Sequence, residues 1–200
     1  MHPILAPVNT VVYGERDGDD MSEQLSAKDW LDQGLRILAS QGFTALKAEP
    51  MAKAMGVSRG SFYWHFADVA TFHAELLKHW REIAAEQVIS GVEASAGAEP
   101  AIAVLLRRSF TIRAALERAV RSWAASDAVA QQAVQAIDKR RLGYIQSLLA
   151  ADGLAPEIAA ARAQVLYWAF LGYALSGRPL PAAQQDAVLS ELIRIALLRP

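Results

Sequence analysis

Residues 55–66 read Met55-Gly56-Val57-Ser58-Arg59-Gly60-Ser61-Phe62-Tyr63-Trp64-His65-Phe66. Gly56 predicts a tight turn, because glycine adopts the positive φ that a corner between two helices needs. Ser58 is placed to cap the N-terminus of the short helix that follows. Val57, Phe62 and Phe66 fall on one side of that helix and are expected to be buried.

The other side of this short helix carries polar and aromatic residues. Tyr63 and Trp64 are adjacent, and two adjacent large aromatics cannot share one helix face, so at least one is exposed. Beside Arg59, an exposed ring favours contact with a DNA backbone or a thymine methyl group. The outward residues are therefore Arg59, Ser61, Tyr63, Trp64 and His65, an arrangement typical of a recognition helix.

The region around this helix resembles the helix-turn-helix of the TetR (tetracycline repressor) family of bacterial transcriptional regulators. The resemblance covers residues 28–80 and is carried by Gly42-Phe43, Lys47, Ala52, Gly56-Val57-Ser58, Gly60-Ser61 and Phe62-Tyr63-Trp64-His65-Phe66. It implies that the chain is a homodimeric, sequence-specific regulator of a palindromic operator. Repression, with release by a small-molecule effector, is the family's usual behaviour.

The resemblance also implies roles for individual residues. Lys47, Tyr63 and His65 are assigned to DNA phosphates, with a hydrogen-bonded structural histidine as the alternative for His65. Gly60 allows the DNA backbone to approach the protein backbone. Arg59 is the best candidate for bidentate contact with guanine, although a phosphate clamp is equally open. The predicted DNA-binding set is Lys47, Ser58, Arg59, Gly60, Ser61, Tyr63, Trp64 and His65.

Three positions depart from the family pattern. Lys47 stands where a serine or threonine is usual, so the hydroxyl cap of the second helix is absent. Pro50 is tolerated only in the first turn of a helix, which places the start of that helix near residues 47–49. Val69 replaces a common lysine and removes one expected phosphate contact.

Composition limits the class of protein. The chain has 200 residues, 53% of them apolar and 20% charged, which suits a compact globular fold and excludes disordered and fibrous classes. It has no cysteine, so neither a disulfide framework nor a thiolate metal site is possible. This is compatible with a reducing cytoplasm. No cofactor is indicated, and no histidine pair has the i, i+4 spacing of a helical metal site.

The net charge of −1 means that contacts with nucleic acid must be local. A modest positive excess between residues 47 and 81 supplies this locality. The first 22 residues are expected to form a flexible tail without a signal peptide, and Met21 is an alternative start. No apolar run suggests a membrane span. His73 and His79 are expected at the surface or at an interface.

The pattern along the chain is helical throughout, with no credible strand. A first helix is expected from the capping box at Ser26 to Gly42, and a connector helix from Asp68 to about Gly91. Residues 93–99 form a loop. Further helices are expected at 100–109, about 112–125, 128 to just before Gly153, 156–176 and from Pro181 to about Leu198.

The predicted fold is therefore all-α, with an N-terminal three-helix DNA-binding domain and a C-terminal helical bundle for ligand binding and dimerisation. The domains are a tail (1–22), a helix-turn-helix domain (23–67), a connector helix (68–92) and a regulatory domain (93–200). A ligand that favours mis-spaced recognition helices would release the operator, and the connector helix is expected to transmit the shift.

The last two helices carry more apolar surface than one amphipathic stripe needs, which indicates a partner subunit. The predicted dimer interface comprises Val165, Ala169, Gly172, Tyr173, Val188, Leu189, Leu192, Ile193 and Ala196. Aromatic and apolar residues in the bundle either line a ligand cavity or form plain core. They are Trp80, Phe110, Leu116, Trp123, Tyr144 and Trp168, with Tyr173 as a further candidate.

The arginines and lysine of the bundle are expected mainly on solvated faces, although one buried arginine would suit an acidic ligand. They are Arg107, Arg108, Arg113, Arg118, Arg121 and Lys139-Arg140-Arg141. Residues 56–60 also match the Gly-x-Ser-x-Gly elbow of hydrolases, but that motif needs a preceding strand and the pattern here is helical. The alternative function is a helical small-molecule-binding or hydrolytic protein with a helix-turn-helix-like corner. A dimeric DNA binder without an effector is also open.

Overall fold

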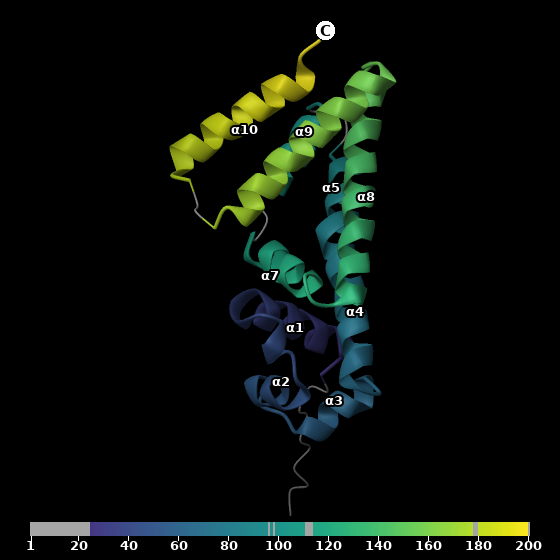
Figure 1. Cartoon of the computed structure of the whole chain (residues 1–200), viewed down its shortest axis with the longest axis vertical. Helices are drawn as coiled ribbons and strands as arrows, with labels where there is room; N and C mark the ends of the chain where they lie inside the picture. Colours follow the sequence, from purple (N-terminus) through teal and green to yellow (C-terminus); the bar gives the residue numbers. More distant parts are fainter. Residues whose placement is uncertain (1–24, 96, 98, 111–113, 178–179, 200) are drawn as a thin grey trace, which may run out of the picture.

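The computed structural model describes residues 25–95, 97, 99–110, 114–177 and 180–199. Every described element is helical, and these residues contain no strand, so the predicted all-α fold is confirmed. The helices form an elongated molecule (Figure 1). One end holds α1, α2 and α3, the other holds α9 and α10, and a column that contains α4, α5 and α8 connects them. The predicted tail at 1–22 lies outside the described residues.

The first helix, α1 (Ala27–Gln41), begins and ends where its sequence signals predict. Ser26 and Asp29 form a capping box, in which each side chain accepts a hydrogen bond from the other residue's backbone amide. Gly42 ends the helix with φ of 81°, and its amide donates to the Leu38 carbonyl. A single 3₁₀ turn, η1 (Phe43–Ala45), leads to the next helix.

The helix-turn-helix consists of α2 (Ala48–Ala54) and α3 (Arg59–His65). Pro50 lies in the first turn of α2, where its missing amide costs no helical hydrogen bond, and Lys47 is the N-cap. Gly56 makes the corner with φ of 70°. Ser58 is the N-cap residue of α3, as predicted, but its hydroxyl makes no capping hydrogen bond, which corrects that part of the expectation.

The connector is not one uninterrupted α-helix. It begins with α4 (Val69–Arg81), capped by the Asp68 carboxylate, which accepts from the Thr71 amide at 2.6 Å. It continues through a π-helical turn, η2 (Glu82–Glu86), into α5 (Gln87–Glu93). The predicted start is confirmed, whereas the π turn is a correction, and the helix ends two residues beyond Gly91.

The bundle contains α6 (Ala101–Ser109), α7 (Ala114–Ala124), α8 (Ala128–Ala151), α9 (Pro156–Leu175) and α10 (Ala182–Leu197). Asp127 caps α8 through the Ala130 amide, and Pro156 is the first residue of α9, as predicted. By length and composition alone, α9 is apolar enough to cross a membrane, which the sequence analysis did not foresee. It packs against α7 and α8 in the bundle.

Buried side chains form two apolar clusters. The first joins α1, α2 and α3 to α4, to α7 and to the first half of α8, and the second lies among α5, α6, α8, α9 and α10. The helix-turn-helix region therefore shares its core with α7. The predicted domain boundaries, after residue 67 and after residue 92, stay a prediction. Because α7 shares this core, it lies between the two ends of the molecule (Figure 1).

Candidate DNA-binding and ligand-binding sites

The short helix α3 is held by the side chain of Phe62, which is fully buried. Its ring makes edge-to-face contacts with Trp30 at 5.4 Å and Phe72 at 5.3 Å, measured between ring centroids. Burying one phenylalanine contributes about 1.5–3 kcal/mol, and the aromatic pairs add to this. A helix of seven residues is too short to be stable alone, so these contacts with α1 and α4 fix its orientation.

The opposite face of α3 is open, as predicted. Trp64 is 88% exposed and Tyr63 is 42% exposed. The Arg59 guanidinium lies over the Tyr63 ring, 5.4 Å from its centroid, and Nη2 is 3.4 Å from the phenol oxygen. This contact pre-positions Arg59 on the exposed side of the helix.

The remaining predicted DNA-binding residues lie around this face. Lys47, Ser58 and Gly60 are exposed, and Ser61 and His65 are half-buried. A Cβ atom added at Gly60 would meet only the Ser58 Oγ, at 3.6 Å, which is ordinary van der Waals contact. The packing of the protein itself therefore does not require glycine at this position.

Two other histidines, His73 and His79, are half-buried at contacts between helices rather than fully exposed. His73 Nε2 lies 3.0 Å from the Leu46 carbonyl, and its ring packs against Phe43 and Trp123. His79 Nε2 lies 2.6 Å from an Asp32 carboxylate oxygen and joins α4 to α1. Both histidines hold the helix-turn-helix region to its neighbours.

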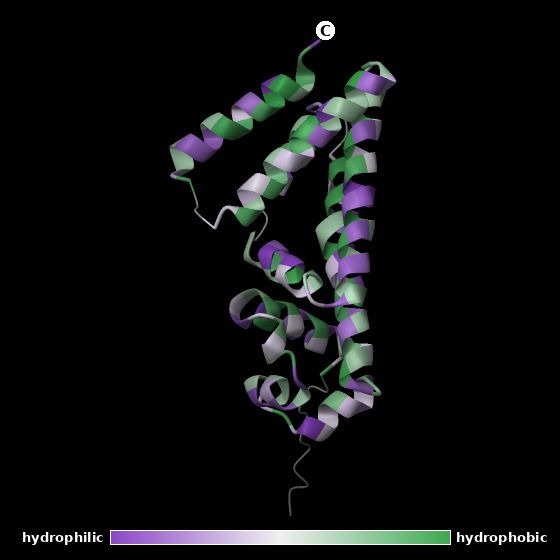
Figure 2. Ribbon diagram, viewed as in Figure 1, coloured by the Kyte–Doolittle hydropathy of each residue, from purple (hydrophilic) through white to green (hydrophobic). Residues whose placement is uncertain are grey.

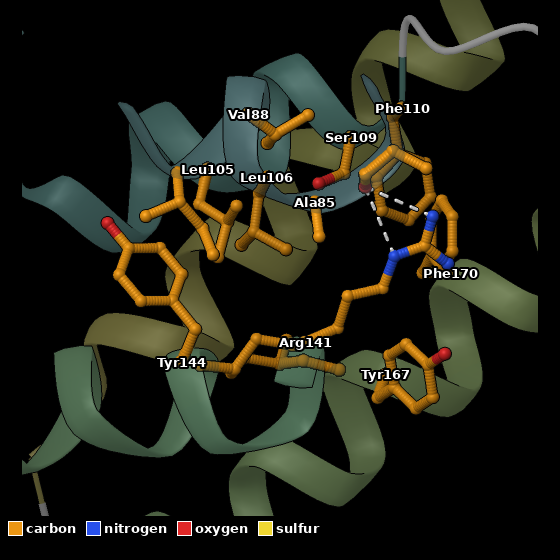
Figure 3. A pocket seen from close by; sticks show the side chains of 14 residues that line it. Ala85, Val88, Leu105, Leu106, Ser109, Phe110, Arg141, Tyr144, Tyr167 and Phe170 are labelled. Carbon is orange, nitrogen blue, oxygen red and sulfur yellow. Dashed lines mark hydrogen bonds between the residues drawn. The ribbon is translucent and has the colours of Figure 1, made fainter. Parts of the chain in front are cut away.

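A cavity lies within the second cluster, enclosed by η2 and α5 on one side and by α6, α8 and α9 on the others (Figure 3). Its wall is mainly apolar, with Arg141, Tyr144, Tyr167 and Ser109 as the polar members. The free volume is about 40 Å³, room for only a few water molecules. Little free space is therefore left between the walls of the cavity in this conformation.

Only Phe110 and Tyr144 among the predicted pocket residues line this cavity. Trp80 is buried in the first cluster, Leu116 packs against it, and Trp123 stacks on Phe43 there. Trp168 is 63% exposed on α9. Tyr173 lies outside the cavity, with its hydroxyl bonded to the Phe110 carbonyl at 2.9 Å. Helical spacing alone does not show which core a residue faces, and the predicted set of ligand-contacting residues stays a prediction.

Next to the cavity is an ion-pair network of half-buried side chains around the buried Glu117. Glu117 on α7 is 2% exposed and accepts from Arg121 Nε at 2.8 Å and from both terminal nitrogens of Arg141 at 3.0 and 3.1 Å. Arg121 also donates to both oxygens of Asp138, and the Tyr167 hydroxyl donates to Asp138 at 2.5 Å. Two arginines and two carboxylates balance in charge.

Burial and electrostatics act in opposite directions on these arginines. Burial lowers the pKa of Arg141, but the neighbouring Glu117 carboxylate outweighs this and raises it overall. Burial and the hydrogen bond to Asp138 both raise the pKa of Tyr167, so its hydroxyl stays protonated. Arg141 and Tyr167 therefore both stay protonated.

The sequence analysis missed this network. It expected most bundle arginines on solvated faces and one buried arginine for an acidic ligand. Arg107, Arg108, Lys139 and Arg140 are exposed, as expected, whereas both half-buried arginines of the network have protein carboxylates as partners. Arg113 lies outside the described residues. A signal was present, because Glu117 and Arg121 are one turn apart on the same helix as the buried Val120.

The predicted dimer interface divides into two groups. Val165, Gly172 and Val188 are exposed and Ala169, Tyr173, Leu189 and Ile193 are half-buried, whereas Leu192 and Ala196 are buried within the chain. The exposed apolar surface extends to Trp168 and Leu175, which lie on the same helix, α9. Figure 2 shows apolar residues along α9 and α10 and hydrophilic ones along the outer side of α8.

Fold and site together define a helix-turn-helix protein in which α3 exposes aromatic and basic residues and a helical bundle follows. Residues 31–68 match the model of the family "Bacterial regulatory proteins, tetR family". A curated relative, the HTH-type transcriptional regulator AcrR of Shigella flexneri, is 41% identical over 46 residues, which are 23% of this chain and 21% of the relative. Over this stretch the chain is similar to transcriptional regulators of the TetR family. The chain thus spans about a fifth of that relative's length.

Two solved structures share the fold over most of the chain. One is a candidate TetR-family transcriptional regulator from Rhodococcus sp., with a TM-score of 0.65 at 16% identity, covering 89% of this chain and 100% of the other. The second is the fatty acid degradation regulator FadR from Bacillus halodurans, with a TM-score of 0.63 at 14% identity. It covers 86% of this chain and 94% of the other. At these identities, the two structures establish the fold alone.

Proposed function

We propose that this protein is a homodimeric, sequence-specific DNA-binding regulator, a repressor that a small molecule releases from a palindromic operator. The observation that carries the proposal is the outward face of α3, with its exposed Trp64 and Tyr63 and the positioned Arg59. Large aromatic side chains that face water are unfavourable in the free protein, because their apolar surface is hydrated. Contact with a DNA groove would remove this surface from water.

Each residue of the predicted DNA-binding set has a role in this proposal. Arg59 contacts a guanine edge, or a phosphate in the alternative, and Trp64 packs on a thymine methyl group or the sugar-phosphate backbone. Lys47, Tyr63 and His65 contact phosphates. The open space at Gly60 supports close approach of the DNA backbone, because no side chain of the protein occupies it. Ser58 and Ser61 complete the surface.

Dimerisation through α9 and α10 would cover their exposed apolar surface. Val165, Trp168, Gly172 and Leu175 follow one another at helical spacing on α9, and Val188 is exposed on α10. A symmetric dimer would bury these residues and set two copies of α3 about 34–36 Å apart, in successive major grooves. Leu192 and Ala196 would support this surface from within the subunit.

The cavity is the proposed effector site, and regulators of this family usually act as dimers with small-molecule effectors. Because η2 and α5 form one wall, a ligand that widens the cavity would displace the connector and the spacing of the recognition helices. Proteins of this family are generally not enzymes, and we propose a regulatory, cytoplasmic role without catalysis or cofactor.

Selection of bound sequences from a random DNA pool tests this function. An inverted repeat should be enriched, and affinity for it should exceed affinity for random DNA by about 10³-fold or more while falling steeply with salt. Lack of enrichment by folded, dimeric protein would contradict the proposal. Small-molecule binding or turnover without salt-dependent DNA binding would instead support the helical binding or hydrolytic alternative.

A further inference from the structure

Arg141 connects the ion-pair network around Glu117 to the backbone of the connector. Its Nε and Nη2 donate to the carbonyl oxygen of Ala84 at 3.3 and 3.2 Å, shown as dashed lines in Figure 3. Ala84 lies in the middle of the π turn η2. A side chain that bonds to a helix carbonyl is a recognised cause of local departure from α-helical geometry, and isolated π turns are frequent at functional sites.

The same guanidinium lines the cavity. Its carbon lies 5.2 Å from the centroid of the Phe170 ring, and Ala84, Phe170 and Arg141 all belong to the cavity wall. The bonds to Ala84 go to a neutral carbonyl, whereas those to Glu117 go to a carboxylate, so the bonds to Ala84 are the easier ones to replace. A ligand with a hydrogen-bond acceptor near Arg141 would compete with Ala84 for these donors.

We infer that Arg141 and the Ala84 carbonyl form a latch that reports occupancy of the cavity, and that the effector is an uncharged, mainly apolar molecule with one hydrogen-bond acceptor. This inference rests on the proposed effector site. The acceptor atom of the ligand replaces the Ala84 carbonyl oxygen as the partner of the Arg141 guanidinium. The π turn then loses its hydrogen bonds to Arg141, and the connector changes its path between the cavity and α4.

The charge of the ligand follows from the network. The positive charge of Arg141 is already balanced by Glu117, and that of Arg121 by Asp138. A carboxylate in the cavity would add a further negative charge, and Arg141 is the only cation among the described residues that line it, so the added charge is costly in a low-dielectric interior. A carbonyl, ester or amide oxygen needs only a hydrogen bond.

The size of the ligand requires the wall to move. A benzene-sized guest occupies a cavity of about 150 Å³, whereas the free volume here is about 40 Å³. Three walls of the cavity belong to the helical bundle, and the fourth is the π turn with α5. Since the latch holds that fourth wall, the cavity opens only when the hydrogen bonds between Arg141 and the Ala84 carbonyl break.

Acetophenone, benzoate and ethylbenzene are suitable probes because they share one ring and differ in the acceptor and the charge. Thermal shift assays on the full chain should rank acetophenone above ethylbenzene, with benzoate giving the smallest shift. Hydrogen exchange of residues 82–89 should increase on addition of acetophenone. Equal or stronger stabilisation by benzoate, or no binding of acetophenone, would overturn the assigned ligand class.

The latch itself is tested by the double variant Arg141→Met with Glu117→Gln, which keeps the network neutral. It should show raised exchange at residues 82–89 without any probe and no further response to acetophenone. The control is Arg140→Met, because Arg140 binds the same turn only through the exposed Glu86 side chain, at 3.1 and 3.0 Å. Wild-type exchange in the double variant would overturn the latch.

Operator binding provides the separate readout. With the sequence selected from the random pool, the double variant should bind about 5- to 150-fold more weakly than the wild type, the usual range of allosteric coupling, and Arg140→Met should bind normally. If wild-type protein selects no operator, the proposed function fails, while hydrogen exchange still decides the latch. Wild-type operator affinity in the folded double variant would count against the latch alone.

Discussion

The indole ring of Trp123 stacks on the ring of Phe43, with centroids 4.5 Å apart and planes 15° from parallel. Trp123 belongs to α7 and Phe43 to η1, so the contact joins the bundle to the turn that precedes the helix-turn-helix. The His73 ring packs against both. Six residues before Trp123 on α7 is Glu117, so one short helix contacts both the ion-pair network and the DNA-binding region.

The variant Trp123→Ala should lower the free energy of unfolding by about 3–5 kcal/mol, because it opens a cavity between α7 and η1. Urea denaturation measures this change. The matched control is Trp64→Ala, which removes the same side chain from an 88% exposed position and should change stability by at most about 0.5 kcal/mol. Comparable losses in both variants would contradict the assigned core.

The variants Arg59→Ala and Lys47→Ala should differ in the kind of DNA binding that they lose. Arg59→Ala should weaken operator binding by about 1–3 kcal/mol and relax one base position, if Arg59 contacts guanine. Lys47→Ala should weaken binding to all sequences and reduce the salt slope by about one. Titrations on operator and random DNA at two salt concentrations separate these effects, and identical profiles would refute the division of roles.

The variant Trp168→Glu should convert the dimer to folded monomers. A central tryptophan commonly contributes about 2 kcal/mol or more to an interface, and a carboxylate there would be buried without a partner. Analytical ultracentrifugation measures the change, and operator affinity should fall with it. Val129→Glu is the control, since Val129 is comparably exposed but lies at the start of α8. An unchanged dimer would exclude this face.

Acid should weaken the cap of the connector helix. The Thr71 backbone amide donates to the Asp68 carboxylate and lowers its pKa, so the unfolded chain binds this proton more tightly than the native one. The stabilisation is complete above the unfolded pKa of about 4 and is lost as pH falls through the lower native pKa.

The variant Asp68→Asn isolates this contribution, because asparagine caps a helix without titrating. The wild type should lose stability relative to the variant as pH falls from about 5 through the native pKa. Urea unfolding of both proteins across this range measures the difference. If the free energies of unfolding of the two proteins changed in parallel with pH, the hydrogen bond from the Thr71 amide to Asp68 would not supply a charge-dependent stabilisation.

Local signals in the sequence predicted most helix ends. Ser26, Gly42, Asp68, Asp127 and Pro156 all mark boundaries that the structure confirms, because capping depends on the few residues around each helix end. The exposed face of α3 was also predicted from local residues. A helix of seven residues has only one side to bury, and Phe62 determines which one.

Features that depend on which helices are neighbours were not predicted. The π turn at η2 forms beside Arg141, which is 57 residues from Ala84 in the chain. Trp80 and Trp168 both have helical spacing with apolar neighbours, yet Trp80 lies in the core and Trp168 is exposed on α9. Periodicity gives the apolar side of a helix but not its partner, so the cavity and the ion-pair network required the tertiary arrangement.

The carbonyl of Phe110 accepts hydrogen bonds from the Tyr173 hydroxyl at 2.9 Å and from the Gln185 side chain at 3.0 Å, while its ring lines the cavity. Tyr173 is on α9 and Gln185 on α10, the helices of the proposed dimer interface. An effector that displaces Phe110 would therefore also act on subunit association. Thermodynamic reciprocity then requires that effector affinity depend on protein concentration wherever monomer and dimer coexist.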